Sequence, residues 1–206
     1  MDLLAELRTR KLLAIIRADS AATALACVDT LVEAGVTALE ISLTTPDAVA
    51  AIAQARATHN PTILIGAGTV LTPAQADQVA AAGATFAVTP AITQGAHRAV
   101  HLGLPLLCGA LTPTEVVAAL DLGATAVKIF PAKTHGPAYL RELAAPLPQA
   151  PLIAVGGIDA TTAPLYLEAG ALAVGVGSPL LGPAAIGGPL PDLTTRATTF
   201  RQTLGL

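Results

Sequence analysis

One lysine of this chain stands inside an apolar segment. Lys128 lies in the run Ala124–Phe130, which follows a glycine at the end of a predicted helix and precedes Gly136-Pro137. A lysine is rarely buried unless its charge is paired or it takes part in function. A buried amine loses its proton more readily than an exposed one, and the neutral amine attacks carbonyl carbons. Lys128 therefore suggests imine formation with a keto substrate; the structural alternative is a strand-end lysine whose ammonium group reaches water.

A glutamate stands in a second apolar segment. Glu40 lies between Leu39 and Ile41, and the alternation of a β-strand turns it to the opposite face from these neighbours. A buried carboxylate needs a partner, which Lys128 or Arg17 could supply. We interpret Glu40 as the acid–base group that moves protons during imine chemistry, with a structural ion pair as the alternative.

Glycine-rich turns follow three other apolar segments. Gly156-Gly157 and Gly177-Ser178 follow the seventh and eighth predicted strands, where many barrels bind phosphate through backbone N–H groups. A plain tight turn is the alternative for each. The segment GAGTV at 66–70 resembles the start of a dinucleotide fingerprint but lacks its third glycine and its acidic residue. We interpret this turn as a carboxylate site made of backbone N–H groups and the Thr69 hydroxyl.

The remaining histidines and lysines give weaker signals. His97 and His101 stand four residues apart on a predicted helix, as zinc ligands do, but helix-outer positions favour solvent-exposed side chains. His135 lies in the loop after Lys128 and is a weak candidate for substrate contact, and Lys133 is predicted to be an exposed loop cation. Since no cluster of His, Asp or Glu suits a divalent metal, we expect no metal site.

Eight apolar segments alternate with Ala- and Leu-rich helical segments along the chain. Four helices end in a repeated glycine phrase, such as DLGATAVKI at 121–129, which is typical of a left-handed glycine closing a helix before a strand. Eight such units predict an α/β protein with a (β/α)8 TIM barrel fold in a single domain, residues 1–206. A doubly wound open sheet is the alternative. The predicted strands are Leu12–Arg17, Ala38–Leu43, Thr62–Gly66, Thr85–Thr89, Pro105–Cys108, Ala124–Phe130, Leu152–Val155 and Ala171–Val176.

The ends of the chain add to this barrel. Asp2–Arg10 is predicted to form an extra N-terminal helix that covers the barrel bottom, and Asp192–Leu204 a last helix after a Gly/Pro-rich loop at 182–191. The chemistry of such barrels lies at the carboxyl ends of the strands. An acid, a lysine, a guanidinium group and glycine turns together at that edge suit an anionic carbonyl substrate.

Composition argues against several other classes. The net charge is −3 with no basic block, so nucleic acid or an anionic membrane is not an expected partner. Hydrophobic residues make up 53% of the chain, yet no apolar run reaches the roughly 18 residues of a membrane span. Cys27 and Cys108 are too few for a disulfide framework and are predicted to be buried free thiols. Without a cleavable signal pattern, we expect a soluble cytoplasmic protein.

Taken together, these motifs resemble the 2-keto-3-deoxy-6-phosphogluconate aldolases. GATAVKIFPAKTHGP at 123–137 is similar to their Schiff-base lysine segment and GVTALEISLTTP at 35–46 to their acid–base segment, while IGAGTVL, FAVTP and AVGGI recur in the same order. The resemblance implies that Lys128 forms the imine and Glu40 shuttles protons. It also implies substrate contacts, with Gly68 and Thr69 at the pyruvyl carboxylate, Gly157 and Ser178 at the phosphate, and Arg17 as a cation. The rim positions Pro90, Gly156 and Gly177 complete the predicted substrate-binding set.

One departure points to a branch of this family. The gluconate aldolases usually carry arginine at the position of Thr44, whereas here Arg17 closes the first strand. These features and Gly136-Pro137 look more like the 2-keto-3-deoxy-6-phosphogalactonate enzymes. The resemblance implies a cofactor-free homotrimer that cleaves such a phospho sugar acid to pyruvate and glyceraldehyde 3-phosphate. The alternatives are a 4-hydroxy-2-oxoglutarate aldolase that uses the same lysine, and a phosphate-binding barrel isomerase or epimerase.

Overall fold

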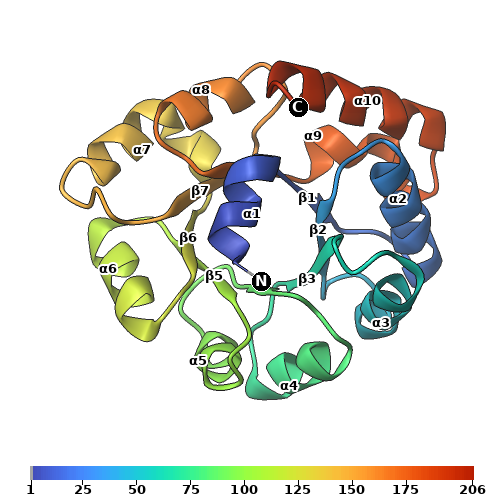
Figure 1. Ribbon diagram of the computed structural model, residues 1–206, viewed down its shortest axis with the longest axis horizontal. Coiled ribbons are helices and arrows are strands. Elements are labelled where there is room, and N and C mark those ends of the chain that lie inside the picture. Colours follow the sequence, from blue (N-terminus) through green and yellow to red (C-terminus); the bar gives the residue numbers. More distant parts are fainter. Residues whose placement is uncertain (1) are drawn as a thin grey trace.

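The computed structural model describes residues 2–206 and contains a closed barrel of eight parallel strands in sequential order (Figure 1). Strand β8 pairs with β1, with Leu13 opposite Gly175, and this pairing closes the sheet. The (β/α)8 prediction is confirmed, and the open-sheet alternative is wrong. The strands are β1 (Leu12–Ile16), β2 (Ala38–Ser42), β3 (Leu64–Gly68), β4 (Ala87–Val88), β5 (Leu106–Ala110), β6 (Ala126–Ile129), β7 (Leu152–Val155) and β8 (Ala173–Val176).

Helices surround the barrel and follow the capping signals of the sequence. Thr72 and Thr112 each form a capping box, with Gln75 and Glu115 respectively, which satisfies the first N–H groups of the helix. Gly123 closes one helix in the left-handed conformation, with φ 98°. The helices are α1 (Leu3–Arg10), α2 (Ala21–Glu33), α3 (Ala48–Thr58), α4 (Pro73–Ala81), α5 (Gln94–His101), α6 (Pro113–Leu122), α7 (Gly136–Ala144), α8 (Ala163–Glu168), α9 (Ser178–Leu181) and α10 (Leu190–Thr203), with 3-10 turns η1 (Ala132–Thr134) and η2 (Gly182–Ile186).

Several boundaries differ from those expected. Strand β3 runs two residues further than predicted, and β4 has only two residues. Helix α3 begins after Asp47 rather than at Thr45-Pro46, because the buried Thr45 hydroxyl accepts the backbone N–H of Ala18 (3.0 Å) and does not cap the helix. The predicted loop at 182–191 contains η2 and the first residues of α10.

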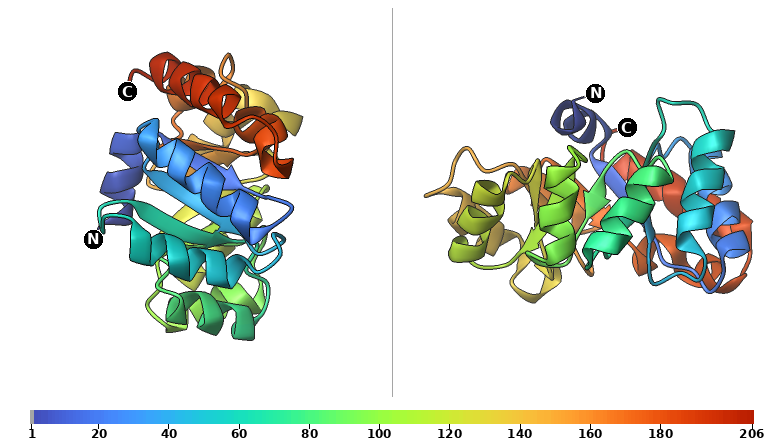
Figure 2. Two further views of the ribbon diagram at one scale, coloured as in Figure 1. Left: turned by 90° about the vertical axis from the view of Figure 1, so that its right-hand side faces the viewer. Right: turned by 90° about the horizontal axis from the view of Figure 1, so that it is seen from below.

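The barrel interior is closed at one end by α1. Leu3 and Leu7 of this helix are buried in one apolar cluster with inward residues of the strands, among them Leu13, Leu64 and Val88. Figures 1 and 2 show α1 lying across the barrel on the side where the strands begin. The predicted covering helix is confirmed, and ligands must reach the interior from the opposite end.

Two further expectations concern cysteines and membrane spans. Cys27 and Cys108 are buried free thiols, as predicted, and burial raises the pKa of Cys27 to about 11 and also raises the pKa of Cys108, so neither is placed as a reactive thiolate. Over residues 2–206 no helix combines the length and the apolar character needed to cross a membrane.

Candidate active site

A cavity of about 520 Å³ lies at the carboxyl ends of the strands, opposite α1. Of the predicted site residues, all within the described range, only Gly68 lies outside its lining. The lining also includes apolar side chains that we did not predict, among them Ile15, Phe130 and Val155. Predicted site residues from the ends of seven different strands therefore line one cavity. The predicted residues in the lining are Arg17, Glu40, Thr69, Pro90, Lys128, Gly156, Gly157, Gly177 and Ser178.

Lys128 enters this cavity from β6. It lies in register with Gly109 of β5 and Ile153 of β7, and only 7% of the residue is exposed. Its Nζ lies 5.0 Å from the centroid of the Phe130 ring, within the range of a cation–π contact. Lys128 is thus largely buried and lines the cavity.

Glu40 enters from β2 and is 2% exposed. Its Oε2 is buried and has no hydrogen-bond partner among the described residues. Burial raises the pKa of the Glu40 carboxyl, while the positive charges of Lys128 and Arg17 act in the opposite direction. The three ion pairs among residues 2–206 do not include Glu40, so the geometry argues against a structural ion pair and leaves an acceptor oxygen free for a proton.

Two glycines of β3 make room for these interior groups. A Cβ atom added to Gly68 would lie 1.8 Å from Oε1 of Glu40, and one added to Gly66 would lie 2.3 Å from Cε2 of Phe86. Phe86 is completely buried. Gly68 is therefore located beneath the Glu40 carboxyl rather than on the cavity surface, and the absent side chain allows the carboxyl its position.

Thr69 follows β3 and has an unusual backbone. Its φ of 63° is left-handed, a conformation that is strained for a β-branched residue and costs about 1–3 kcal/mol. Its hydroxyl lies 3.0 Å from the Ser42 hydroxyl, which lies 2.8 Å from that of Thr44. Arg17 donates from Nε to the Thr44 hydroxyl at 3.1 Å. Backbone strain beside a cavity is typical of functional positions.

The glycine turn after β7 lies on the far wall of the cavity. Gly156 and Gly157 have φ of 106° and 72°, conformations that favour glycine. The Phe130 ring packs on Gly156, 3.1 Å from where a Cβ would be, and the Lys133 stem packs on Gly157, with Cδ 2.6 Å from that point. Lys133 is exposed, as predicted, and its backbone N–H donates to the Gly156 carbonyl (3.1 Å), so it packs against this glycine turn.

Pro90 reaches the cavity because β5 carries a glycine beside it. A Cβ added to Gly109 would lie 2.2 Å from the carbonyl of Pro90. Gly109 is also the register partner of Lys128. The absence of a side chain at Gly109 thus lets the loop after β4 approach β5, the strand next to the one that carries Lys128.

Comparison with known proteins identifies the family. The family model described as "KDPG and KHG aldolase" matches residues 3–189. The 2-dehydro-3-deoxy-6-phosphogalactonate aldolase of Escherichia coli (strain K12) is 39% identical over 171 residues, which are 82% of this chain and 83% of that protein. This chain belongs to the KDPG and KHG aldolase family.

Solved structures of this aldolase family have the same fold. The structure described as "Native KDPGal structure" has a TM-score of 0.87 and 35% identity, covering 95% of this chain and 96% of that chain. The KDPG aldolase of Legionella pneumophila, solved with pyruvate captured as a covalent carbinolamine intermediate, has a TM-score of 0.83 and 28% identity, covering 98% and 96%.

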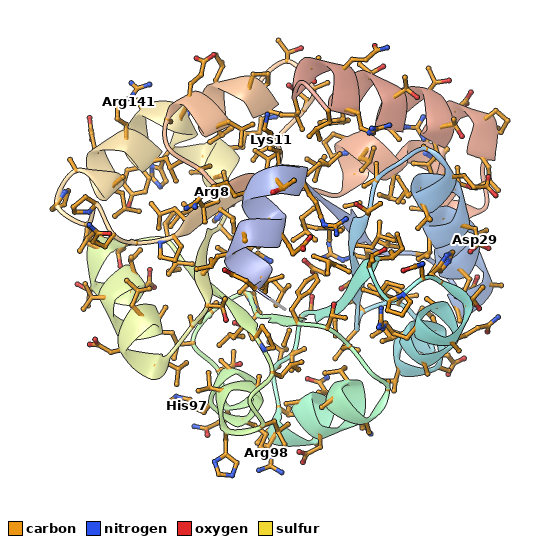
Figure 3. All side chains as sticks on the ribbon, in the orientation of Figure 1. Arg8, Lys11, Asp29, His97, Arg98 and Arg141 are labelled. Atoms are coloured by element: carbon orange, nitrogen blue, oxygen red, sulfur yellow. The ribbon has the colours of Figure 1, made fainter. Side chains whose placement is uncertain are left out.

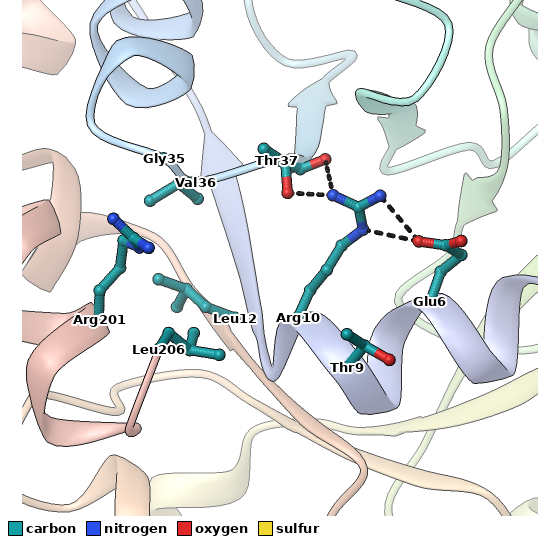
Figure 4. A pocket seen from close by; sticks show the side chains of 9 residues that line it. All are labelled: Glu6, Thr9, Arg10, Leu12, Gly35, Val36, Thr37, Arg201 and Leu206. Atoms are coloured by element: carbon teal, nitrogen blue, oxygen red, sulfur yellow. Dashed lines mark hydrogen bonds and ion pairs between the residues drawn. The ribbon is translucent and has the colours of Figure 1, made fainter.

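A second cavity in this aldolase lies at the other end of the barrel (Figure 4). It has about 330 Å³ and is lined by residues of α1, α10 and the loop before β2. Arg10 is paired with Glu6 (2.7 Å) and bonds the backbone oxygen of Thr62, and Arg201 donates to the carbonyl of Ala34. Arg10 is therefore held by contacts within the protein, and Arg201 ties α10 to the end of α2.

The histidine pair of α5 faces solvent, as predicted. His97 and His101 are exposed, and Figure 3 shows His97 and Arg98 on the outer side of the aldolase barrel. Arg98 pairs with Asp77 at 2.8 Å. No group of three or more His, Cys, Asp or Glu side chains suited to a metal occurs in the described part of the chain.

Among the residues at the site that were not predicted from the sequence, two could have been found from an available signal. Ser42 and Phe130 each stand two positions after a predicted catalytic residue, Glu40 and Lys128. Strand alternation places residues i and i+2 on the same face. Counting two positions on from Glu40 therefore gives Ser42, and counting two positions on from Lys128 gives Phe130.

Proposed function

We propose that this chain is a class I aldolase that cleaves a 2-keto-3-deoxy-6-phospho sugar acid to pyruvate and glyceraldehyde 3-phosphate. The observation that carries this proposal is a buried lysine and a buried, unpartnered carboxylate that line one cavity in a chain of this family. Lysine imines turn a ketone into an electron sink without a metal or cofactor, and we propose that none is used.

The first step is imine formation at Lys128. The amine adds to the C2 carbonyl carbon of the substrate, and the resulting carbinolamine takes up a proton and loses water to give a protonated imine. The positive imine nitrogen then draws electrons from the C3–C4 bond. The Phe130 ring supports this step, because its centroid lies 5.0 Å from Nζ, where it faces the resulting cation.

The second step is bond cleavage with Glu40 as the proton acceptor. Its carboxylate, directly or through a water molecule, takes the proton of the C4 hydroxyl as the C3–C4 bond breaks. C4 leaves as the aldehyde carbon of glyceraldehyde 3-phosphate, and the electron pair forms an enamine between C2 and C3. Glu40 then returns the proton to C3, and hydrolysis of the imine releases pyruvate and free Lys128. A carboxyl whose pKa is raised by burial is suited to both taking and returning a proton.

Substrate binding requires contacts for two anions. We propose Thr69 for the carboxylate next to the ketone, with Gly68 holding Glu40 beside it. For the phosphate we propose the glycine turns at 156–157 and 177–178, where backbone N–H groups suit an anion. Arg17, which follows β1, supplies a positive charge for the anionic substrate. Pro90 forms part of the apolar wall of the cavity.

Thr44 supports a galactonate-type substrate. It stands where the gluconate aldolases usually place arginine, and it binds Arg17 instead of adding a charge of its own. The Escherichia coli relative named for phosphogalactonate agrees with this choice. We therefore expect the galactonate epimer to be cleaved at least as well as the gluconate epimer.

A second candidate is cleavage of 4-hydroxy-2-oxoglutarate by the same lysine. The family description names KHG aldolase beside KDPG aldolase, and the chemistry at Lys128 and Glu40 would be the same. This substrate carries no phosphate, so the glycine turns would have no anion to bind. An isomerase or epimerase would have no use for a buried imine-forming lysine, and we do not favour it.

For the protein as a whole we propose a single-domain, cytoplasmic homotrimer. Its partners would be small keto acids and sugar phosphates, without nucleic acid or membrane. The trimer rests on the family resemblance and on a similar solved structure, a protein cage designed by fusing symmetric oligomeric domains.

The proposal is tested by measuring pyruvate release from four substrates, namely both C4 epimers with and without phosphate. The phosphorylated galactonate epimer should be among the best, and loss of the phosphate should lower kcat/KM by about tenfold or more, since each lost charge-assisted bond contributes about 1.5–3 kcal/mol. Lys128→Arg should abolish turnover while Lys11→Arg, at the barrel bottom, should not. Pyruvate release that survives Lys128→Arg would reject the class I mechanism.

A further inference from the structure

Three adjacent strand ends at the candidate site are joined by a row of hydrogen bonds. The row starts at Arg17 after β1, passes through Thr44 and Ser42 on β2 and its turn, and ends at Thr69 after β3. The successive distances are 3.1, 2.8 and 3.0 Å. Both ends of the row, Arg17 and Thr69, line the cavity, whereas the two middle residues do not.

The donors and acceptors of this row can be ordered from the chemistry of its ends. A guanidinium group only donates, so the Thr44 hydroxyl accepts from Arg17 and is free to donate its own proton to Ser42. A carboxylate only accepts, so a Thr69 hydroxyl that binds one must donate to it and accept from Ser42. Both ends impose the same direction, from Arg17 through Thr44 and Ser42 to Thr69 and the ligand.

The backbone around this row holds its members in place. Ser42 is fully buried and lies on the Glu40 face of β2. Thr45, the neighbour of Thr44, accepts the N–H of Ala18 next to Arg17 (3.0 Å), and the N–H of Leu43 donates to the carbonyl of Gly68 next to Thr69 (2.8 Å). The strained conformation of Thr69 therefore lies in a frame that fixes its hydroxyl relative to Ser42.

We propose that Ser42 and Thr44 are positioning residues that form a one-directional hydrogen-bond chain, which orients Arg17 and Thr69 for an anionic substrate. Aligned hydrogen bonds polarise one another, so the positive charge of Arg17 strengthens the hydroxyl donor that Thr69 presents to the carboxylate. Thr44 thereby fixes the arginine of the first strand. This inference rests on the proposed function, because it takes Thr69 and Arg17 as substrate contacts.

The test compares Thr44→Val, Thr44→Ser and Ser42→Ala with the unmodified protein. Thr44→Val keeps the shape and removes the hydroxyl, so KM for 2-keto-3-deoxy-6-phosphogalactonate should rise about tenfold with kcat within about threefold, the size expected for losing a bond to a charged group. Thr44→Ser retains the hydroxyl and should restore the KM. Thr58→Val, an exposed hydroxyl on α3, controls for removal of a threonine hydroxyl that lies outside the site.

A second measurement separates the two middle residues. The pyruvate concentration that half-saturates borohydride trapping reports on the carboxylate end alone. Ser42→Ala removes the direct partner of Thr69 and should raise this concentration about tenfold, whereas Thr44→Val, one bond further away, should raise it less than about threefold. Thermal unfolding of each variant checks that the fold is kept.

The outcomes distinguish this inference from the proposed function. If the unmodified protein forms no adduct with pyruvate, the proposed function is wrong and the inference falls with it. If it forms the adduct on Lys128 but Thr44→Val and Thr44→Ser have equal KM, or Ser42→Ala leaves pyruvate binding unchanged, the hydrogen-bond chain alone is rejected. A fall in kcat without a change in KM would also reject a positioning role.

Discussion

At the scale of single residues, Glu40 combines burial with an oxygen that no described residue binds. We predict that Glu40→Gln, which keeps the shape but cannot accept the C4 hydroxyl proton, slows cleavage by about 10²–10⁴-fold, the range of general acid–base groups. Trapping of pyruvate on Lys128 should still occur, because imine formation uses the lysine. Single-turnover kinetics with the folded variant measure this, and unchanged turnover would make Glu40 a structural residue.

The raised pKa of Glu40 also predicts how stability depends on pH. Between the ordinary value of 4.5 and the raised value of the folded state, the folded protein holds a proton that the unfolded chain has lost. Stability therefore falls as pH rises through this window. Glutamine imitates the protonated acid, so Glu40→Gln should gain stability relative to the unmodified protein as pH increases above 4.5. Urea unfolding of both proteins over a pH series checks this, and a constant difference would contradict it.

Single residues were predictable from the sequence where their type conflicts with their surroundings. Lys128 and Glu40 stand out because charged side chains are rare in apolar strands. Ser42 and Phe130 fit their segments without conflict, and only their position in the barrel brings them to the candidate site. The place of Gly68 under the Glu40 carboxyl depends on the register of β2 against β3, which side-chain patterns within one strand do not encode.

At the scale of elements, strand β3 is built for its neighbours inside the barrel. Gly66 lies against the buried ring of Phe86, so Gly66→Ala should destabilise the fold by about 1–3 kcal/mol, the usual cost of overpacking. Phe86→Leu in the same chain should recover part of this loss, because the shorter side chain leaves room for the new methyl group. A double-mutant cycle of unfolding free energies tests the contact, and strictly additive effects would show that the two residues do not meet.

Element boundaries were less predictable than the elements themselves. Thr45-Pro46 has the composition of a helix start, but the Thr45 hydroxyl is used by the loop after β1. Arg196 of α10 donates to the carbonyls of Leu180 and Leu181, which lie in α9 just before the segment 182–191, so the last helix is tied to the start of this segment. In both cases a partner distant in sequence determines the local structure.

At the scale of the whole molecule, the two ends of the barrel differ in role. Helix α1 stabilises the fold at one end, and the candidate active site lies at the other. Leu7 of α1 is completely buried at the bottom, far along the strands from Lys128 and Glu40. Leu7→Ala should lower the free energy of unfolding by about 2–5 kcal/mol and leave kcat/KM unchanged at temperatures where the protein stays folded. The exposed Arg8, on the same helix (Figure 3), provides the control Arg8→Ala. A loss of activity at constant fold would show that the two ends are coupled.

The whole fold was predictable because the chain repeats one unit. Eight apolar segments, each followed by a helix and many of them preceded by a closing glycine, leave few topologies open, and the short connections favour a closed parallel sheet. The second cavity at the barrel bottom was not predicted, since it depends on how α1 and α10 meet the loop before β2.

The most direct test of the central claim is covalent trapping of pyruvate by borohydride, followed by intact mass and peptide mapping. We predict one adduct per chain, on Lys128, because it is the lysine that lines the cavity beside Glu40. Lys128→Arg should abolish the adduct, and Lys11→Arg should not. The absence of an adduct, or an adduct on Lys133 or Lys11, would contradict the account.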